Sequence, residues 1–353
     1  MERKSYVFII VSFVGALVFA GNFVSAAQTP KTVPELALYK GPDRQQILEE
    51  GAKKEGKVTF YTTGVMTQAV RPLVAAFQKR YPFIRTQIWR ANIPSIIARL
   101  REEYKTGKKI CDVVEGSQLI QMFMRESNIA QPFYSPNMVN MKEEALTKSP
   151  EGAYYSVAFR GSGISLGYNT TMLSEKDLPK TYQDLLDPKW KGKMAMASGG
   201  TGANWIGSML HDYGEDFLKK IVQQDPDIHV MSGRALLDMI IAGEYGLSPT
   251  IYDSHAILSK KKGAPVDWFP LEPVPTVLGA IAMPKSSPNP HAALLFIDFE
   301  VTKEGAEIYK AAGYSPFHKE VPAPKAYKKY FGPPTMKEAK RQVDIFNRLF
   351  LKK

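Results

Sequence analysis

Cysteine is almost absent from this chain of 353 residues, in which Cys111 is the one example. Intramolecular disulfides, CxxC redox motifs and zinc ribbons are therefore excluded. The sequence also lacks an HExxH motif, a P-loop of the GxxxxGK[ST] type and a GxGxxG fingerprint that opens a βαβ unit. These absences predict a protein that is not an enzyme and that needs no cofactor or resident metal.

Acidic residues are in the minority, because 35 Asp and Glu face 46 Lys and Arg, for a net charge of +11. This balance favours anionic partners without choosing among nucleic acid, membranes and small anions. Long apolar runs are missing after Ala20, which excludes a polytopic membrane protein. With 44% hydrophobic and 23% charged residues, the chain has the composition of a globular protein of about two domains.

The first 27 residues are typical of a secretory signal peptide. Arg3 and Lys4 precede an apolar run, Val7 to Ala20, and small residues at the right spacing predict cleavage near Ala26 or Ala27. The alternative, an uncleaved membrane anchor, is disfavoured because the run falls short of the roughly 20 residues that span a bilayer. No cysteine is present there to carry a lipid, so we expect a protein free in the periplasm.

The mature chain alternates apolar strands with amphipathic helices. Strands are predicted at 57–61, 83–89 and 110–114, and each is followed by a helix, the second of which would begin at Ser95 as its N-cap. Further strands are predicted at 164–168 and 194–197. Such alternation predicts α/β units with parallel strands, and ligands of such sheets bind where strands end and helices begin. The polar residues at these ends are Thr62, Thr63, Gly64 and Ser117.

The segment SGGTGAN, residues 198–204, is the most informative loop. Its glycines allow close approach of a ligand, and Ser198, Thr201 and the amides of the following helix can bind an anion. A flexible turn is the alternative. Two arginines, Arg160 in VAFRGSG and Arg234 in SGRALL, can bind a carboxylate or phosphate, or can instead form a structural salt bridge or lie in solvent.

Tyr252, Asp253 and His255 form the one cluster of metal-ligand types, and it is a weak signal, since core packing is favoured for His255. Cys111 lies in an apolar strand and is expected to be buried. The basic segment KAYKKYF, residues 325–331, is interpreted as a solvated face, and export makes nucleic acid an improbable partner.

Several segments together resemble the periplasmic solute-binding proteins of ABC importers, in the iron(III)-type branch of the type II binding fold. They span almost the whole mature chain, and the most specific are YQDLLDPKWKGK, residues 182–193, and AALLFIDF with the following EGAEIY, residues 292–309. The resemblance implies two α/β lobes joined by hinge strands, with lobe 1 from residues 28–157 and 275–353 and lobe 2 from 158–274. It also implies ligand capture by hinge closure and delivery to a membrane permease.

The resemblance further implies which residues bind. The anion-binding turn of the iron-binding relatives is matched by Thr201, Gly202 and Ala203, their arginine by Arg160, and a further polar contact by Ser232 and Arg234. Their pair of adjacent tyrosines is reduced here to Tyr252, and Val65 stands where some have a histidine. We therefore predict a monomeric receptor for a small organic anion: a carboxylate, phosphonate or phosphate ester.

Two other functions remain open at this level. A ferric-ion binder would use Tyr252 and Asp253 with a synergistic anion. A secreted hydrolase would need a nucleophile and base such as Ser254 and His255 within reach of each other.

Overall fold

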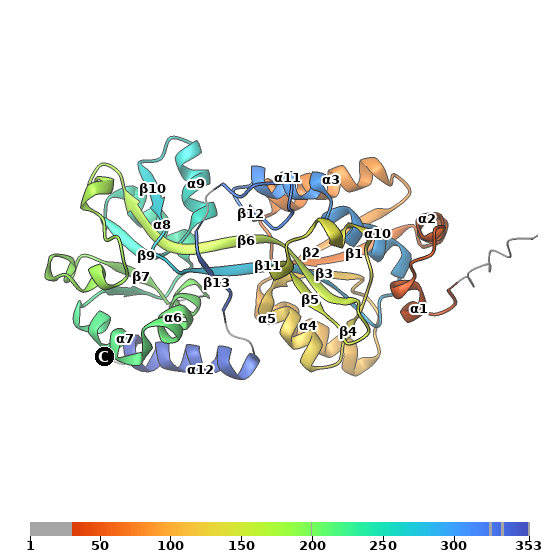
Figure 1. The fold of residues 1–353 in the computed structure, drawn as a ribbon, viewed down its shortest axis with the longest axis horizontal. Coiled ribbons are helices and arrows are strands. Elements are labelled where there is room, and N and C mark those ends of the chain that lie inside the picture. Colours follow the sequence, from red (N-terminus) through yellow and green to blue (C-terminus); the bar gives the residue numbers. More distant parts are fainter. Residues whose placement is uncertain (1–29, 199, 325–326, 333–334, 352–353) are drawn as a thin grey trace, which may run out of the picture.

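Two α/β lobes lie side by side and are joined by two long strands (Figure 1). The structure, a computed structural model, describes residues 30–198, 200–324, 327–332 and 335–351. The predicted signal peptide, residues 1–27, lies outside the described residues. No helix in the described part of the chain is both long enough and apolar enough to span a membrane.

The first lobe is built from parallel strands, with β1 between β2 and β3, as the alternation in the sequence predicts. Its elements are α1 (Val33–Leu38), α2 (Arg44–Glu55), β1 (Lys57–Thr62), α3 (Arg71–Arg80), β2 (Arg85–Arg90), α4 (Ile93–Thr106), β3 (Val113–Ser117) and α5 (Gln118–Glu126). The chain returns to this lobe as α10 (Pro290–Glu300) and α11 (Lys303–Ala311). Helix α10 is apolar and buried along nearly its whole length, and Phe296 packs against Phe60 of β1.

The second lobe pairs its strands differently. Its elements are β7 (Ala195–Ala197), α6 (Gly200–Asp212), α7 (Gly214–Gln223), β8 (Asp227–His229), α8 (Gly233–Ala242), β9 (Leu247–Tyr252), α9 (Asp253–Lys261) and β10 (Val266–Phe269). Strands β9 and β10 flank the connecting strand β6 in antiparallel pairs, whereas β7 and β8 form a separate parallel pair. Short helical turns complete the chain at 66–70, 136–140, 143–145, 175–177, 183–186 and 188–190.

The connecting strands are β6 (Tyr154–Asn169) and β11 (Val274–Pro284), which pair antiparallel from Gly163 opposite Thr276 to Val157 opposite Ile281. Both run through the two lobes (Figure 1). Short strands extend them: β4 (Ala130–Gln131), β5 (Leu146–Lys148), β12 (Ser315–Pro316) and β13 (Lys329–Tyr330). The predicted strand 164–168 is therefore only the last part of a 16-residue strand.

Two helix starts differ from the predictions. Helix α4 begins at Ile93, not after Ser95, because the side chain of Asn92 accepts a hydrogen bond from the Ser95 amide at 2.9 Å and is the N-cap. Within the predicted loop 198–204, helix α6 already begins at Gly200.

The C-terminal helix α12 (Met336–Phe346) and the following turn (Asn347–Leu351) pack on the second lobe. Ile345, Phe346 and Phe350 belong to the hydrophobic cluster that includes Trp205 of α6. This differs from the predicted division of the chain, which assigned all of 275–353 to the first lobe. The apolar face of the helix packs against the hydrophobic cluster of the second lobe, so the last segment of the described chain belongs to that lobe.

We predict that Phe350→Ala destabilises the protein by about 3 kcal/mol, because a buried ring that stacks on Phe346 is lost. Urea unfolding followed by fluorescence measures the change. Val139→Ala, at a position that is 73% exposed on the first lobe, is the control and should change stability little. Equal stability of the two variants would show that the C-terminal segment is not part of the core.

Candidate functional site

A cavity of about 450 Å³ lies between the lobes. Both lobes contribute to it, with Ile93, Ser117, Gln118 and Leu119 from the first and Ser198, Gly200, Ala203, Asn204 and Tyr252 from the second. Val277 of β11 and side chains of α12 complete the wall. A cavity of this size suits a small organic molecule.

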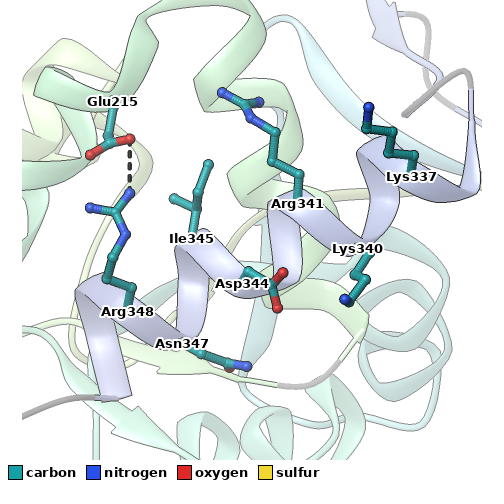
Figure 2. A pocket seen from close by; sticks show the side chains of 8 residues that line it. All are labelled: Glu215, Lys337, Lys340, Arg341, Asp344, Ile345, Asn347 and Arg348. Atoms are coloured by element: carbon teal, nitrogen blue, oxygen red, sulfur yellow. Dashed lines mark ion pairs between the residues drawn. The ribbon is translucent and has the colours of Figure 1, made fainter.

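A larger hollow of about 730 Å³ lies on the outer side of α12, where it does not reach the first lobe (Figure 2). Its walls are mainly charged side chains of the C-terminal segment, and Arg348 forms an ion pair with Glu215 at 2.9 Å. We assign the ligand site to the cavity between the lobes because that cavity alone of the two joins both halves of the molecule.

Two helices begin at the cavity between the lobes. Helix α5 starts after Ser117, and helix α6 starts at Gly200. The Ser117 hydroxyl lines the cavity, is buried, and has no hydrogen-bond partner among the described residues. Thr201 Oγ1, in the first turn of α6, is likewise buried and unpartnered in the described part of the chain. Free amides and hydroxyls at helix starts are donors suited to an anion.

The glycine in the first turn of α6 has a packing role. A Cβ atom on Gly202 would lie 2.1 Å from the carbonyl oxygen of Ala197, so only glycine lets the helix approach the end of β7 this closely. The sequence pattern suggested a ligand loop at this position, whereas the glycine serves the junction between strand and helix.

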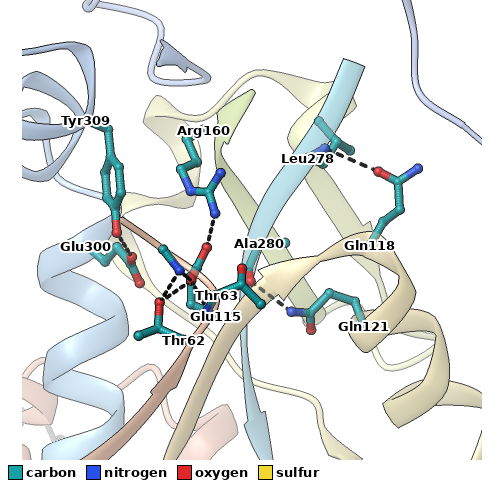
Figure 3. Close-up of polar contacts among 11 residues, drawn as sticks. Thr62, Thr63, Glu115, Gln118, Gln121, Arg160, Leu278, Ala280, Glu300 and Tyr309 are labelled. Carbon is teal, nitrogen blue, oxygen red and sulfur yellow. Dashed lines mark hydrogen bonds and ion pairs between the residues drawn. The ribbon is translucent and has the colours of Figure 1, made fainter. Parts of the chain in front are cut away.

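Glu115, at the end of β3, is the centre of a buried network (Figure 3). Its Oε2 atom accepts from the Thr62 hydroxyl and from the amides of Thr63 and Gly64, the latter two at 3.1 and 3.2 Å. Its Oε1 atom forms an ion pair with Nη2 of Arg160. The pairing of β1 with β3 sets Thr62 opposite Glu115, which brings these groups together. The carboxylate of Glu115 thus accepts from Thr62, Thr63 and Gly64, which we predicted to bind a ligand.

Arg160 lies inside β6, opposite Gly279 of β11. A Cβ atom on Gly279 would come within 2.5 Å of the guanidinium carbon, so the glycine makes room for the arginine. Burial is the largest single influence and disfavours the charged guanidinium, but Glu115 together with Tyr314 and Tyr309 outweighs it, so the pKa of Arg160 is raised. Of the two roles considered from the sequence, the structure shows the salt bridge.

A second buried carboxyl, Glu300, lies behind this pair and accepts a hydrogen bond from the Tyr309 hydroxyl at 2.7 Å (Figure 3). Burial raises the pKa of Glu300 well above its usual range. Of these two buried carboxyl groups, Glu115 is the one that forms the ion pair with Arg160, whereas burial favours the neutral form of Glu300.

The other predicted site residues lie outside the cavity lining. Ser232 caps α8 by accepting from the Ala235 amide, and Arg234 binds Asp238 at 2.6 Å and Ser259 at 2.8 Å near the surface. Asp253 accepts from the Ser254 amide and, at 2.9 Å, from the Tyr327 hydroxyl. Ser198, Ala203 and Tyr252 do line the cavity with Ser117.

Sequence reasoning missed one wall of the cavity, which Met336, Ala339, Lys340, Val343 and Phe346 form on α12. No local signal in the sequence shows that this helix lies at the cleft.

In the described part of the chain, no three His, Cys, Asp or Glu residues are placed to hold a metal ion. Burial lowers the pKa of His255 to about 4, and its Nδ1 atom has no partner among the described residues. The segment Gly163–Gly167 has GxSxG spacing, but Ser165 is fully buried within β6 and accepts from the Leu271 amide at 2.7 Å. Cys111 is buried, as predicted.

Two α/β lobes on a pair of connecting strands, with a cavity between them, define a cleft-type binding protein. The chain belongs to the family of bacterial extracellular solute-binding proteins, which residues 72–335 match. The prediction of a solute-binding protein of the type II fold is thereby confirmed, and the chain is a binding protein rather than an enzyme.

Individual relatives agree with this assignment. An uncharacterized protein of Haemophilus influenzae is 27% identical over 277 residues, which cover 73% of this chain and 76% of that protein. Iron-bound HitA from Pseudomonas aeruginosa is 19% identical, with a TM-score of 0.70, and covers 83% of this chain and 99% of its own. AfuA from Actinobacillus pleuropneumoniae, with fructose-6-phosphate bound, is 21% identical, with a TM-score of 0.68, and covers 85% and 100%. At these identities the solved structures establish the shared fold.

We predict that Arg160→Met destabilises the protein by about 3–5 kcal/mol, because Glu115 is then left buried without its cation. The double variant Arg160→Met with Glu115→Gln should recover a large part of this loss. Thermal and urea unfolding of the four proteins in the cycle measure the coupling. Additive effects, or an Arg160 variant of unchanged stability, would contradict an internal role for the ion pair.

Proposed function

We propose that the protein is the periplasmic substrate-binding component of an ABC importer, which captures a small organic anion between its lobes and delivers it to the permease. The family assignment and the predicted signal peptide support the transport role. The ligand class rests on the site, where the unpartnered Ser117 hydroxyl and the starts of α5 and α6 meet the cavity and the described lining carries no acidic side chain.

The Ser117 hydroxyl is the observation on which the anion assignment depends. A buried hydroxyl without a partner costs free energy in the empty protein, and a bound acceptor removes that cost. Ser117 stands at the start of α5, and across the cavity Ser198 and Gly200 precede and begin α6. The positive ends of two helix dipoles thus face one space from both lobes. A carboxylate or phosphate group would join the lobes by accepting from each.

A ferric ion is less well supported as the ligand. Iron is bound in HitA, but here burial raises the pKa of Tyr252 to about 12, so its phenol is protonated at neutral pH. Asp253 already accepts from Ser254 and Tyr327. Forming a tyrosinate and freeing this carboxylate would both oppose metal binding. AfuA, which was solved with fructose-6-phosphate, shows that the fold accepts an organic anion.

We predict that Ser117→Ala weakens binding of the anionic ligand about tenfold or more, since a hydrogen bond to a charged group contributes about 1.5 kcal/mol or more and the variant leaves the anion short of that donor. Stability should not fall, because the hydroxyl has no protein partner to lose among the described residues. Ser127→Ala, at the opposite end of α5, is the matched control. Isothermal titration gives both affinities. Equal affinity of the two variants would remove Ser117 from the site.

We expect native mass spectrometry of the exported protein to show a bound organic anion, with no stoichiometric iron in a metal analysis of the same sample. If the purified protein carries no ligand, it is titrated with citrate, fructose 6-phosphate, phenylacetate and ferric citrate. Iron bound at one equivalent would overturn the proposal in favour of a ferric carrier. Failure of every anion to bind would also contradict it.

A further inference from the structure

We infer that the ligand is an amphipathic organic anion, whose charged group binds at the starts of α5 and α6 and whose apolar part packs against the C-terminal helix α12. This inference rests on the proposed function and narrows the ligand class. The chemistry is that of a carboxylate or phosphate ester with an alkyl chain or an aromatic ring.

Helix α12 has two different faces. Gln342, Ile345 and Phe346 are buried, and the last two belong to the hydrophobic cluster of the second lobe, although Gln342 and Phe346 also reach the edge of the cavity. Met336, Ala339 and Val343 follow the i, i+3, i+7 spacing of one helical stripe and line the cavity between the lobes. Val343 is 42% exposed, one of few large apolar side chains to be so exposed in the described residues. Packing against the second lobe therefore does not explain why the side chains of this stripe are apolar.

The apolar wall continues beyond the helix. Ile93 and Leu119 of the first lobe and Val277 of β11 face the same cavity as the stripe on α12. A lone phosphate or acetate ion would leave these side chains against water in a space of about 450 Å³. A ligand with its own apolar part removes that contact with water, so it matches both the size and the lining of the cavity.

The charge of the lining indicates an anion. Lys340 is the one formally charged residue among those described as lining the cavity. Figure 2 shows Lys340 and Asn347 directed to one side of α12, whereas Lys337 and Arg341 are directed to the other. Lys337 lines the outer hollow but not the cavity, which makes it a natural control for Lys340. An organic cation would be repelled by this lysine, and an uncharged sugar would gain no ion pair from it.

The experiment is a series of straight-chain carboxylates, acetate, butyrate, hexanoate and octanoate, with phenylacetate, citrate and inorganic phosphate, titrated into the purified protein. We expect affinity to rise about fourfold for each buried methylene. A flat series, or tighter binding of citrate or phosphate than of octanoate, would overturn this inference while leaving an anion receptor in place. Absence of binding by every anion would overturn both.

Variants on α12 localise the apolar contact. We expect Val343→Gln to weaken octanoate and phenylacetate binding about tenfold and to leave citrate and phosphate unaffected. Val139→Gln, at an exposed valine of the first lobe, should change neither. Lys340→Gln should weaken phenylacetate but not its neutral amide, whereas Lys337→Gln should weaken neither. Octanoate that binds Val343→Gln as well as or better than the parent would show that α12 is not the apolar wall.

Discussion

The buried ion pair between Arg160 and Glu115 is the constraint on which the rest of the site depends. It ties the connecting strand β6 to the end of β3, and its carboxylate also accepts from Thr62, Thr63 and Gly64. Burying a charge is unfavourable unless most of its hydrogen-bonding capacity is used, and these donors meet most of that need for the carboxylate of Glu115. The strand ends of the first lobe are thereby occupied. A second anion placed there would be repelled by Glu115, so the site that we propose for the ligand is displaced to the helix starts.

This displacement explains why the donors at the cavity are neutral. Ser117, Ser198 and the amides at the start of α6 carry no charge that would need a permanent partner in the empty protein. The guanidinium that could have bound an anion directly is neutralised within the protein. The positive charge that does reach the cavity, Lys340, comes instead from the end of the chain, on a long side chain in contact with solvent. The positive charge at the cavity thus comes from the solvent-exposed Lys340, and the hydrogen-bond donors come from the helix starts.

Elements with a strong local signal were predictable from the sequence. Strands β1, β2 and β7 fall within a few residues of their predicted places, because periodicity and flanking glycine or proline mark them. The predicted strand 164–168 is shorter than β6 because Gly161 and Gly163 are residues typical of a loop. In the structure, long-range pairing with β11 holds them extended. The partner of Arg160 lies 45 residues away, and only tertiary structure selects Glu115 from the other acids. For the same reason Ser232 and Arg234, which resemble ligand residues locally, are a helix cap and a surface ion pair.

The position of α12 links ligand contact to the relative placement of the lobes. Since its buried face is part of the second-lobe core, any rotation about β6 and β11 carries the helix with that lobe. Its other face then moves relative to Ile93 and Leu119 of the first lobe, which line the same cavity. A molecule that contacts both walls stabilises one placement over others, because a ligand shifts a conformational equilibrium only by binding one state more tightly. The anionic group at the helix starts and the apolar part on α12 would act in the same direction, so a ligand that offers both favours the closed arrangement more strongly than a small ion held by hydrogen bonds alone.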